Sequence, residues 1–152
     1  MTNLKEGQKA PSFKGLNEKG EEISLADYKG KKLILFFYPK DNTPTCTVEA
    51  CNFRDNYELL ENKGFVLLGV SPDSQRKHQN FIKKHEFPFS LLADVDRAVI
   101  KAYDVWGPKQ MFGKKYEGVY RTTFVIDEKG VIEKIFTKVK AKNHTQQILE
   151  AM

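Results

Sequence analysis

The sequence has few cysteines and histidines. Only two of its 152 residues are cysteines, Cys46 and Cys51, and only three are histidines. A structural zinc site usually needs four Cys or His ligands in closely spaced pairs. Two cysteines five residues apart, with His78, His85 and His144 at unrelated spacings, give a metal site little support. We expect all three histidines to be exposed.

Other absences limit the cofactor and the compartment. No apolar run approaches the length of a membrane span, and residues 1–9 are polar and lack the apolar core of a signal peptide. There is no glycine-rich phosphate-binding motif, and nothing calls for haem, flavin or nucleotide. We therefore expect a cytoplasmic protein without a cofactor and without membrane contact. In a compartment that keeps thiols reduced, two neighbouring cysteines are more often catalytic than structural.

The charge is modestly basic. The net charge of +5 comes from lysines spread along the chain, with clusters at 114–115 and 138–142. Such clusters can mark a nucleic-acid surface. Acidic residues are interleaved almost throughout and no nucleic-acid-binding motif is present, so we favour an ordinary solvated surface. The alternative is a binding protein without enzymatic activity that uses this basic surface and the segment 105–116.

The apolar pattern indicates one α/β domain over residues 1–152, with no repeat, linker or low-complexity segment. Residues 13–25 predict a small N-terminal hairpin, and residues 121–136 predict a second hairpin near the other end. Three short apolar runs predict buried strands: 32–37, 65–70 and 89–93. Strands that alternate with helices favour a mixed central sheet flanked by helices.

Helices are expected between these strands. The predicted helices cover 44–62, 74–85, a short segment from Asp94 or Asp96 to Tyr103, and a last helix capped by Asn143. In the first of them, Leu59 and Leu60 are candidates for the core. Residues 105–116 are expected to form a loop, and its unusual length hints at function.

Cys46 lies at the predicted start of a helix. Thr43 is expected to be the N-cap and Pro44 the first helical residue, which places Cys46 in the opening turn. Backbone N–H groups and the helix dipole at that position favour the thiolate, which is the nucleophilic form of cysteine. The alternative is a buried and inert thiol.

Cys51 follows Cys46 by five residues in the same predicted helix. Their Cα atoms would be about 8 to 9 Å apart on an intact helix, beyond the limit of about 7 Å for a disulfide. A bridge between them would therefore require a turn of helix to unwind, so oxidation of Cys46 should be coupled to local unfolding over 46–52. Cys51 can instead be an inert core thiol.

Three segments carry a resemblance to a known family. PKDNTPTC (39–46) resembles the peroxiredoxin pattern of Pro, three residues, Thr or Ser, two residues and Cys. Its continuation TVEACNFRD (47–55) is similar to the bacterioferritin-comigratory or Q-type branch, and RTTFVID (121–127) resembles the strand with the family's active-site arginine. Thr45 stands where this branch commonly has Gly. The resemblance covers nearly the whole chain.

The resemblance implies a thioredoxin-like sandwich and a thiol-dependent peroxidase for hydrogen peroxide and organic hydroperoxides. Cys46 would be oxidised to a sulfenic acid, which Cys51 would resolve as an intramolecular disulfide. Thioredoxin or glutaredoxin would reduce the disulfide, and the enzyme would be a monomer. The rival hypothesis is a thiol–disulfide oxidoreductase or redox sensor, which would be expected to use Cys-X-X-Cys.

The resemblance also implies the remaining site residues. Arg121 would be catalytic, although the sequence alone favours a solvent-facing strand end. The Thr43 hydroxyl would help to hold the peroxide. Pro39 would shield the thiol from water, or it only terminates the preceding strand. Glu49 is a secondary candidate that can instead pair with Arg54 on the helix surface.

Overall fold

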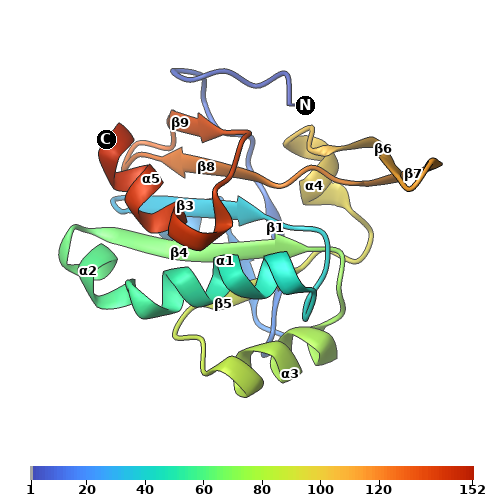
Figure 1. Ribbon diagram of the computed structural model, residues 1–152. Helices are drawn as coiled ribbons and strands as arrows, with labels where there is room; N and C mark the ends of the chain where they lie inside the picture. Colours follow the sequence, from blue (N-terminus) through green and yellow to red (C-terminus); the bar gives the residue numbers. More distant parts are fainter. Residues whose placement is uncertain (1) are drawn as a thin grey trace.

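Strand β3 (Lys32–Phe37) is an inner strand of a seven-stranded mixed sheet with the order β2-β1-β5-β4-β3-β8-β9 (Figure 1). The computed structural model describes residues 2–152. β3 is parallel to its neighbour β4 and antiparallel to β8. The other strands of this sheet are β1 (Lys14–Asn17), β2 (Glu22–Ser24), β4 (Phe65–Ser71), β5 (Ser90–Ala93), β8 (Thr122–Ile126) and β9 (Ile132–Phe136).

Helices cover both faces of the sheet. They are α1 (Pro44–Asp55), α2 (Tyr57–Asn62), α3 (Gln75–His85), α4 (Ala98–Ala102) and α5 (His144–Ala151). Because side chains alternate along a strand, Ile34 and Phe36 point to one face and Leu33, Leu35 and Phe37 to the other. No helix within residues 2–152 is both long and apolar enough to cross a membrane.

Two apolar clusters fill the space between the layers. The first packs even-numbered β3 residues against α1, α3 and α5, through Ile34, Phe36, Leu67, Val125, Ala50, Phe53, Phe81 and Ile148. The second packs the odd-numbered residues against α4 and the N-terminal segment, through Leu33, Leu35, Phe37, Leu68, Val70, Phe124, Val99, Ile100, Tyr103, Ala10 and Phe13. The near-continuous apolar run of β3 is what burial on both faces requires.

Most predicted elements are confirmed, but the first helix is shorter than expected. Both hairpins and all three buried strands are present. The predicted helix 44–62 is wrong at Asn56, where α1 ends before α2 begins (φ −111°, ψ 13°). The Asn56 side-chain amide donates to the Asn52 carbonyl at 2.8 Å. Such side-chain bonds compete with the regular helical pattern.

The predicted loop 105–116 is also wrong. It contains β6 (Trp106–Met111) and the first half of β7 (Lys114–Val119), which pair as a separate antiparallel hairpin that projects from the main sheet (Figure 1). Phe112 and Gly113 form its two-residue turn, both with positive φ (51° and 78°). A turn of this kind is usually marked by Asn-Gly or Asp-Gly. Here Phe112 takes the place of the Asn or Asp, so the sequence does not predict the turn. The Phe112 side chain is 98% exposed.

Two helix starts differ from expectation. α4 begins at Ala98, later than Asp94 or Asp96, and the Asp94 carboxylate accepts from the N–H groups of Val99 (3.2 Å) and Ile100 (2.7 Å). Asn143 does occupy the N-cap position of α5, but its side chain makes no capping hydrogen bond within the described chain. A 3-10 turn over Ala141–Asn143 leads into this helix instead.

Leu59 and Leu60 provide a test of the register of α2. Leu60 is 1% exposed, whereas Leu59 is 43% exposed, so the prediction that both face the core is wrong for Leu59. Leu60→Ala should lower the free energy of unfolding by about 2 to 5 kcal/mol, because it opens a cavity. Leu59→Ala should change it by no more than about 0.5 kcal/mol. Urea titration of both variants would measure this, and equal losses would contradict the register.

Candidate active site

Cys46 lies in the first turn of α1, as predicted, at the end of the loop that follows β3. It is the third helical residue, after Pro44 at the first position. Its side chain is 2% exposed. The Arg121 guanidinium donates from Nη2 to the Cys46 Sγ at 3.1 Å. A guanidinium and the N-terminal turn of a helix therefore both lie at this sulfur.

The loop before α1 contains Pro39 and Thr43. Thr43 has the extended backbone of an N-cap (φ −84°, ψ 154°). Its hydroxyl donates to the Lys40 carbonyl at 2.9 Å and makes no capping bond within the described chain, so the expectation of a side-chain cap is wrong. Pro39 is half-buried, directly after Tyr38. A hydrogen bond within the loop therefore stabilises it immediately before α1.

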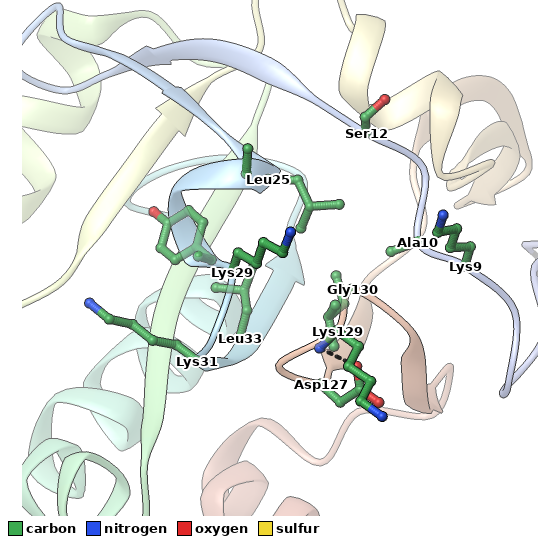
Figure 2. A pocket seen from close by; sticks show the side chains of 13 residues that line it. Lys9, Ala10, Ser12, Leu25, Lys29, Lys31, Leu33, Asp127, Lys129 and Gly130 are labelled. Atoms are coloured by element: carbon green, nitrogen blue, oxygen red, sulfur yellow. Dashed lines mark hydrogen bonds between the residues drawn. The ribbon is translucent and has the colours of Figure 1, made fainter.

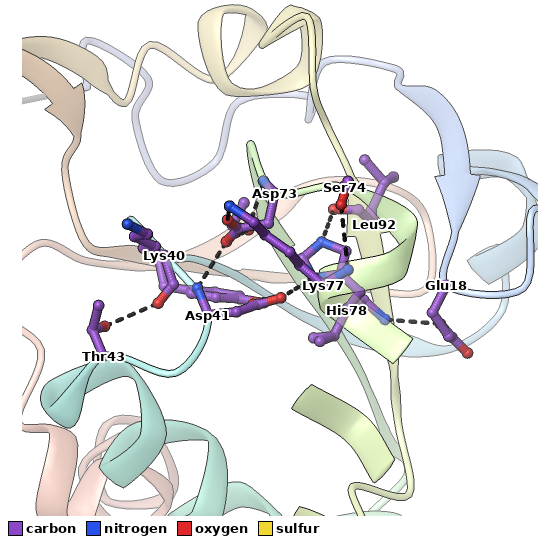
Figure 3. A network of polar contacts seen from close by, with 12 residues as sticks. Glu18, Lys40, Asp41, Thr43, Asp73, Ser74, Lys77, His78 and Leu92 are labelled. Carbon is purple, nitrogen blue, oxygen red and sulfur yellow. Dashed lines mark hydrogen bonds and ion pairs between the residues drawn. The ribbon is translucent and has the colours of Figure 1, made fainter. Parts of the chain in front are cut away.

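A buried polar network holds this loop against α3 (Figure 3). Tyr38 donates its hydroxyl to Asp41 Oδ1 at 2.6 Å, and the Asp41 N–H donates to Asp73 Oδ2 at 2.7 Å. The His78 ring bridges Asp41 Oδ2 at 2.7 Å and the Leu92 carbonyl at 3.0 Å. The prediction that His78 is exposed is wrong, because it is fully buried. In the sequence, His78 is three residues before Phe81, and this helical spacing could have indicated that both side chains are buried.

Glu49 holds the other side of the Arg121 guanidinium. Arg121 Nη1 donates to Glu49 Oε1 at 2.7 Å, so one guanidinium contacts both the carboxylate and the Cys46 sulfur. Glu49 is 1% exposed, and its Oε2 has no hydrogen-bond partner among residues 2–152. Burial raises the pKa of Glu49 to about 7, although Arg121 opposes the shift. The suggested Glu49–Arg54 pair is wrong, since Arg54 pairs with Asp55 at 3.0 Å.

His144 is the third member of this buried group. Its Nε2 lies 2.8 Å from the Thr123 hydroxyl and 3.9 Å from Glu49 Oε2. The prediction that His144 is exposed is wrong, since it is fully buried, and burial lowers its pKa to about 4. His144 is four residues before Ile148 and lies on the same face of α5, which the sequence pattern could have indicated.

Two cavities of about 350 Å³ each lie near opposite ends of β8. One is beside Arg121 and is lined by Lys109, Tyr120, Arg121, Thr122, Thr137, Lys138 and Val139. The other is near the start of β3 and is lined by four lysines, including Lys29 and Lys129, around Leu33 (Figure 2). Arg121, which lines the first cavity, also contacts Cys46. Lys109 comes from β6, in the segment that was expected to be a loop.

Cys51 lies in the second half of α1 with its thiol free, as is that of Cys46. It is half-buried, and burial raises the pKa of its thiol. Its Sγ is 3.9 Å from Nδ1 of His85. His85 is also partly buried rather than exposed as predicted. Both cysteines lie on one continuous helix, as the prediction of a necessary unwinding step requires.

The comparisons of this chain with known sequences and solved structures agree with one another. Residues 6–135 match the AhpC/TSA family. The chain is 49% identical over 146 residues to peroxiredoxin Bcp of Bacillus subtilis, covering 96% of this chain and 93% of that protein. It is similar to the solved structure of a cysteine-to-serine mutant of PrxQ from Xylella fastidiosa (TM-score 0.92, 30% identity, 99% and 96% coverage). Peroxiredoxin Q of Xanthomonas campestris gives a TM-score of 0.85 at 36% identity, with 91% and 88% coverage.

The buried Glu49 carboxyl makes stability depend on pH. Folding raises its pKa from 4.5 to about 7, so between these values the folded state retains a proton that the unfolded state has released. The contribution of Glu49 to the free energy of unfolding therefore falls by about 3 kcal/mol as the pH rises through this window. Glu49→Gln should lack this decline, and the exposed control Glu58→Gln should retain it. Denaturant titrations across the window would measure it; parallel curves for wild type and Glu49→Gln would contradict the burial argument.

Proposed function

This chain belongs to the AhpC/TSA family, as a peroxiredoxin of the Bcp or Q type, and is a thiol-dependent peroxidase, and we propose that Cys46 is the sulfur oxidised by its peroxide substrate. The observation that carries this proposal is the 3.1 Å contact between Arg121 Nη2 and Cys46 Sγ in the first turn of α1. An inert core thiol is uncharged and does not require a guanidinium beside it. A thiolate nucleophile does, because the cation compensates its charge in a buried place.

The proposed first step uses the arrangement around Arg121. The Cys46 thiolate attacks one peroxide oxygen, the O–O bond breaks, and the sulfur becomes a sulfenic acid while water or an alcohol leaves. Negative charge moves from the sulfur to the departing oxygen. Arg121 and the N–H groups of the first turn can stabilise it throughout, and Glu49 fixes the guanidinium at the correct angle.

Thr43 and Pro39 complete the proposed peroxide site. Both belong to the loop that leads into α1, and the network around Asp41 keeps this loop in place. The Thr43 hydroxyl would exchange the Lys40 carbonyl for the second peroxide oxygen. Pro39 would limit access of water to the sulfur. The cavity beside Arg121 offers the approach for the substrate.

We further propose that Cys51 resolves the sulfenic acid. Attack by its thiol forms an intramolecular disulfide after the front of α1 unwinds. The enzyme uses a thiol reductant, and a dithiol of the thioredoxin or glutaredoxin type would restore both thiols by exchange. Since both cysteines belong to one chain, residues 1–152 would work as a single domain and a monomer. A reducing cytoplasm suits this cycle.

Two cysteine variants test the assignment. Cys46→Ser should abolish peroxide turnover, because it removes the nucleophile. Cys51→Ser should leave the first oxidation unchanged but block the disulfide, so Cys46 would stop at the sulfenic acid. Stopped-flow consumption of hydrogen peroxide, with and without a thioredoxin system, measures the first effect, and non-reducing mass analysis measures the second. Turnover by Cys46→Ser would exclude Cys46 as the nucleophile. Wild-type protein that is oxidised without forming an intramolecular disulfide would exclude Cys51 as the resolving cysteine.

Arg121→Ala tests the role of the guanidinium. The rate of the first oxidation should fall by about 100- to 1,000-fold, the usual cost of one removed transition-state donor. The loss should exceed the accompanying loss of thiolate, measured by ultraviolet absorbance. Arg76→Ala removes an exposed arginine on α3 and serves as the control. If the reduced thiolate population accounted for the whole loss, Arg121 would only set the ionisation of Cys46.

A further inference from the structure

The two halves of α1 are held by different partners. In the front half, the side chains of Cys46 and Glu49 both bind Arg121. In the rear half, the Asn52 side chain donates to the Lys142 carbonyl (3.0 Å) and accepts from the Thr145 N–H (2.9 Å). The rear half is thus tied to the segment that contains α5.

A second tie joins the rear half of α1 to the end of α3. Arg54 donates from Nη1 to the His85 carbonyl at 2.9 Å. The front half is tied to the sheet through Arg121, and the first N–H groups of a helix have no intrahelical partners. In the proposed unwinding step, Cys46 would therefore move toward Cys51, whose half of the helix keeps its ties to α3 and α5.

Cys51 is positioned against the ring of His85. The Sγ to Nδ1 distance is 3.9 Å. The ring stacks on Phe87 with centroids 5.4 Å apart and an interplanar angle of 22°, and it meets Phe81 edge-on at 5.4 Å and 87°. These aromatic contacts fix the plane of the imidazole, with Nδ1 facing the thiol. In the tautomer with the proton on Nε2, Nδ1 presents its lone pair to the sulfur.

We propose that His85 is a catalytic residue of the resolving step: its Nδ1 takes the proton of Cys51 as the Cys51 sulfur attacks the Cys46 sulfenic acid. This inference rests on the proposed function. The S–S bond forms and the S–O bond of the sulfenic acid breaks. The hydroxide that leaves combines with the proton from His85, directly or through solvent, to give water. The peroxide consumed in the first step is the only oxidant required.

The surrounding charges suit this role. Arg54 and Asp55 face the pair from α1, Lys84 lies on α3, and Glu86 follows it. Burial, with Lys84 and Arg54, lowers the pKa of His85, so the imidazole is neutral near pH 7 and can accept a proton. An ordinary thiol is only about 3% thiolate at pH 7, and burial raises the pKa of Cys51 further. A base next to Cys51 can therefore increase the rate at which its sulfur attacks.

The experiment separates the two oxidation steps in the intact enzyme. Hydrogen peroxide is mixed with reduced protein, the reaction is quenched with an alkylating agent, and mass analysis follows sulfenic acid and disulfide over time. His85→Phe retains the stacking and His85→Gln retains a polar group, and neither supplies a base. In both, the first step should stay within about twofold of wild type, and disulfide formation near pH 7 should slow by about 10- to 100-fold.

The pH profile distinguishes a base from a merely structural contact. The deficit of both variants should shrink as the pH rises and solvent ionises Cys51, and added imidazole should partly restore the rate in His85→Ala. Lys83→Gln, an exposed neighbour on α3, should behave as wild type. A deficit that is constant with pH, or disulfide formation within twofold of wild type in both variants, would overturn the proposal. Loss of Cys46 oxidation in wild type would instead refute the proposed function.

Discussion

A single guanidinium joins the parts of the site. Arg121 precedes β8 and contacts the sulfur of Cys46 and the carboxylate of Glu49, which belong to successive turns of α1. The three groups are largely buried, so none could carry its charge there alone. Arg121 thereby ties the cysteine helix to the sheet and places a cation at the sulfur with the same contacts. Glu49, whose Oε2 lacks a hydrogen-bond partner among residues 2–152 and whose pKa burial raises to about 7, is the part of this arrangement most sensitive to pH.

The sequence predicted the elements whose signals are local. Pro44 after Thr43 marked the start of α1 and so the position of Cys46, and the apolar run of β3 marked a strand buried on both faces. The family and its thioredoxin-like fold were also predicted and are confirmed. These features could be read because a few adjacent residues determine each of them.

The predictions that failed depend on partners distant in sequence. His78 and His144 are polar residues whose burial is possible only because Asp41 and Thr123 arrive from other elements to bind them. The β6–β7 hairpin pairs chiefly with itself, and its turn carries Phe112 where Asn or Asp is usual. The contact of Arg121 with Cys46 spans 75 positions, and only the family resemblance predicted it.

The placement of both cysteines on α1 has a consequence for recognition. Because an intact helix cannot contain the proposed Cys46–Cys51 bridge, the disulfide and dithiol forms of the proposed cycle would present different surfaces. A reductant that docks on the opened segment would then distinguish the two forms without contacting the sulfur atoms directly. Once exchange is complete, rewinding of the helix would remove the surface to which the reductant was bound. The folding of a few residues would then drive its release.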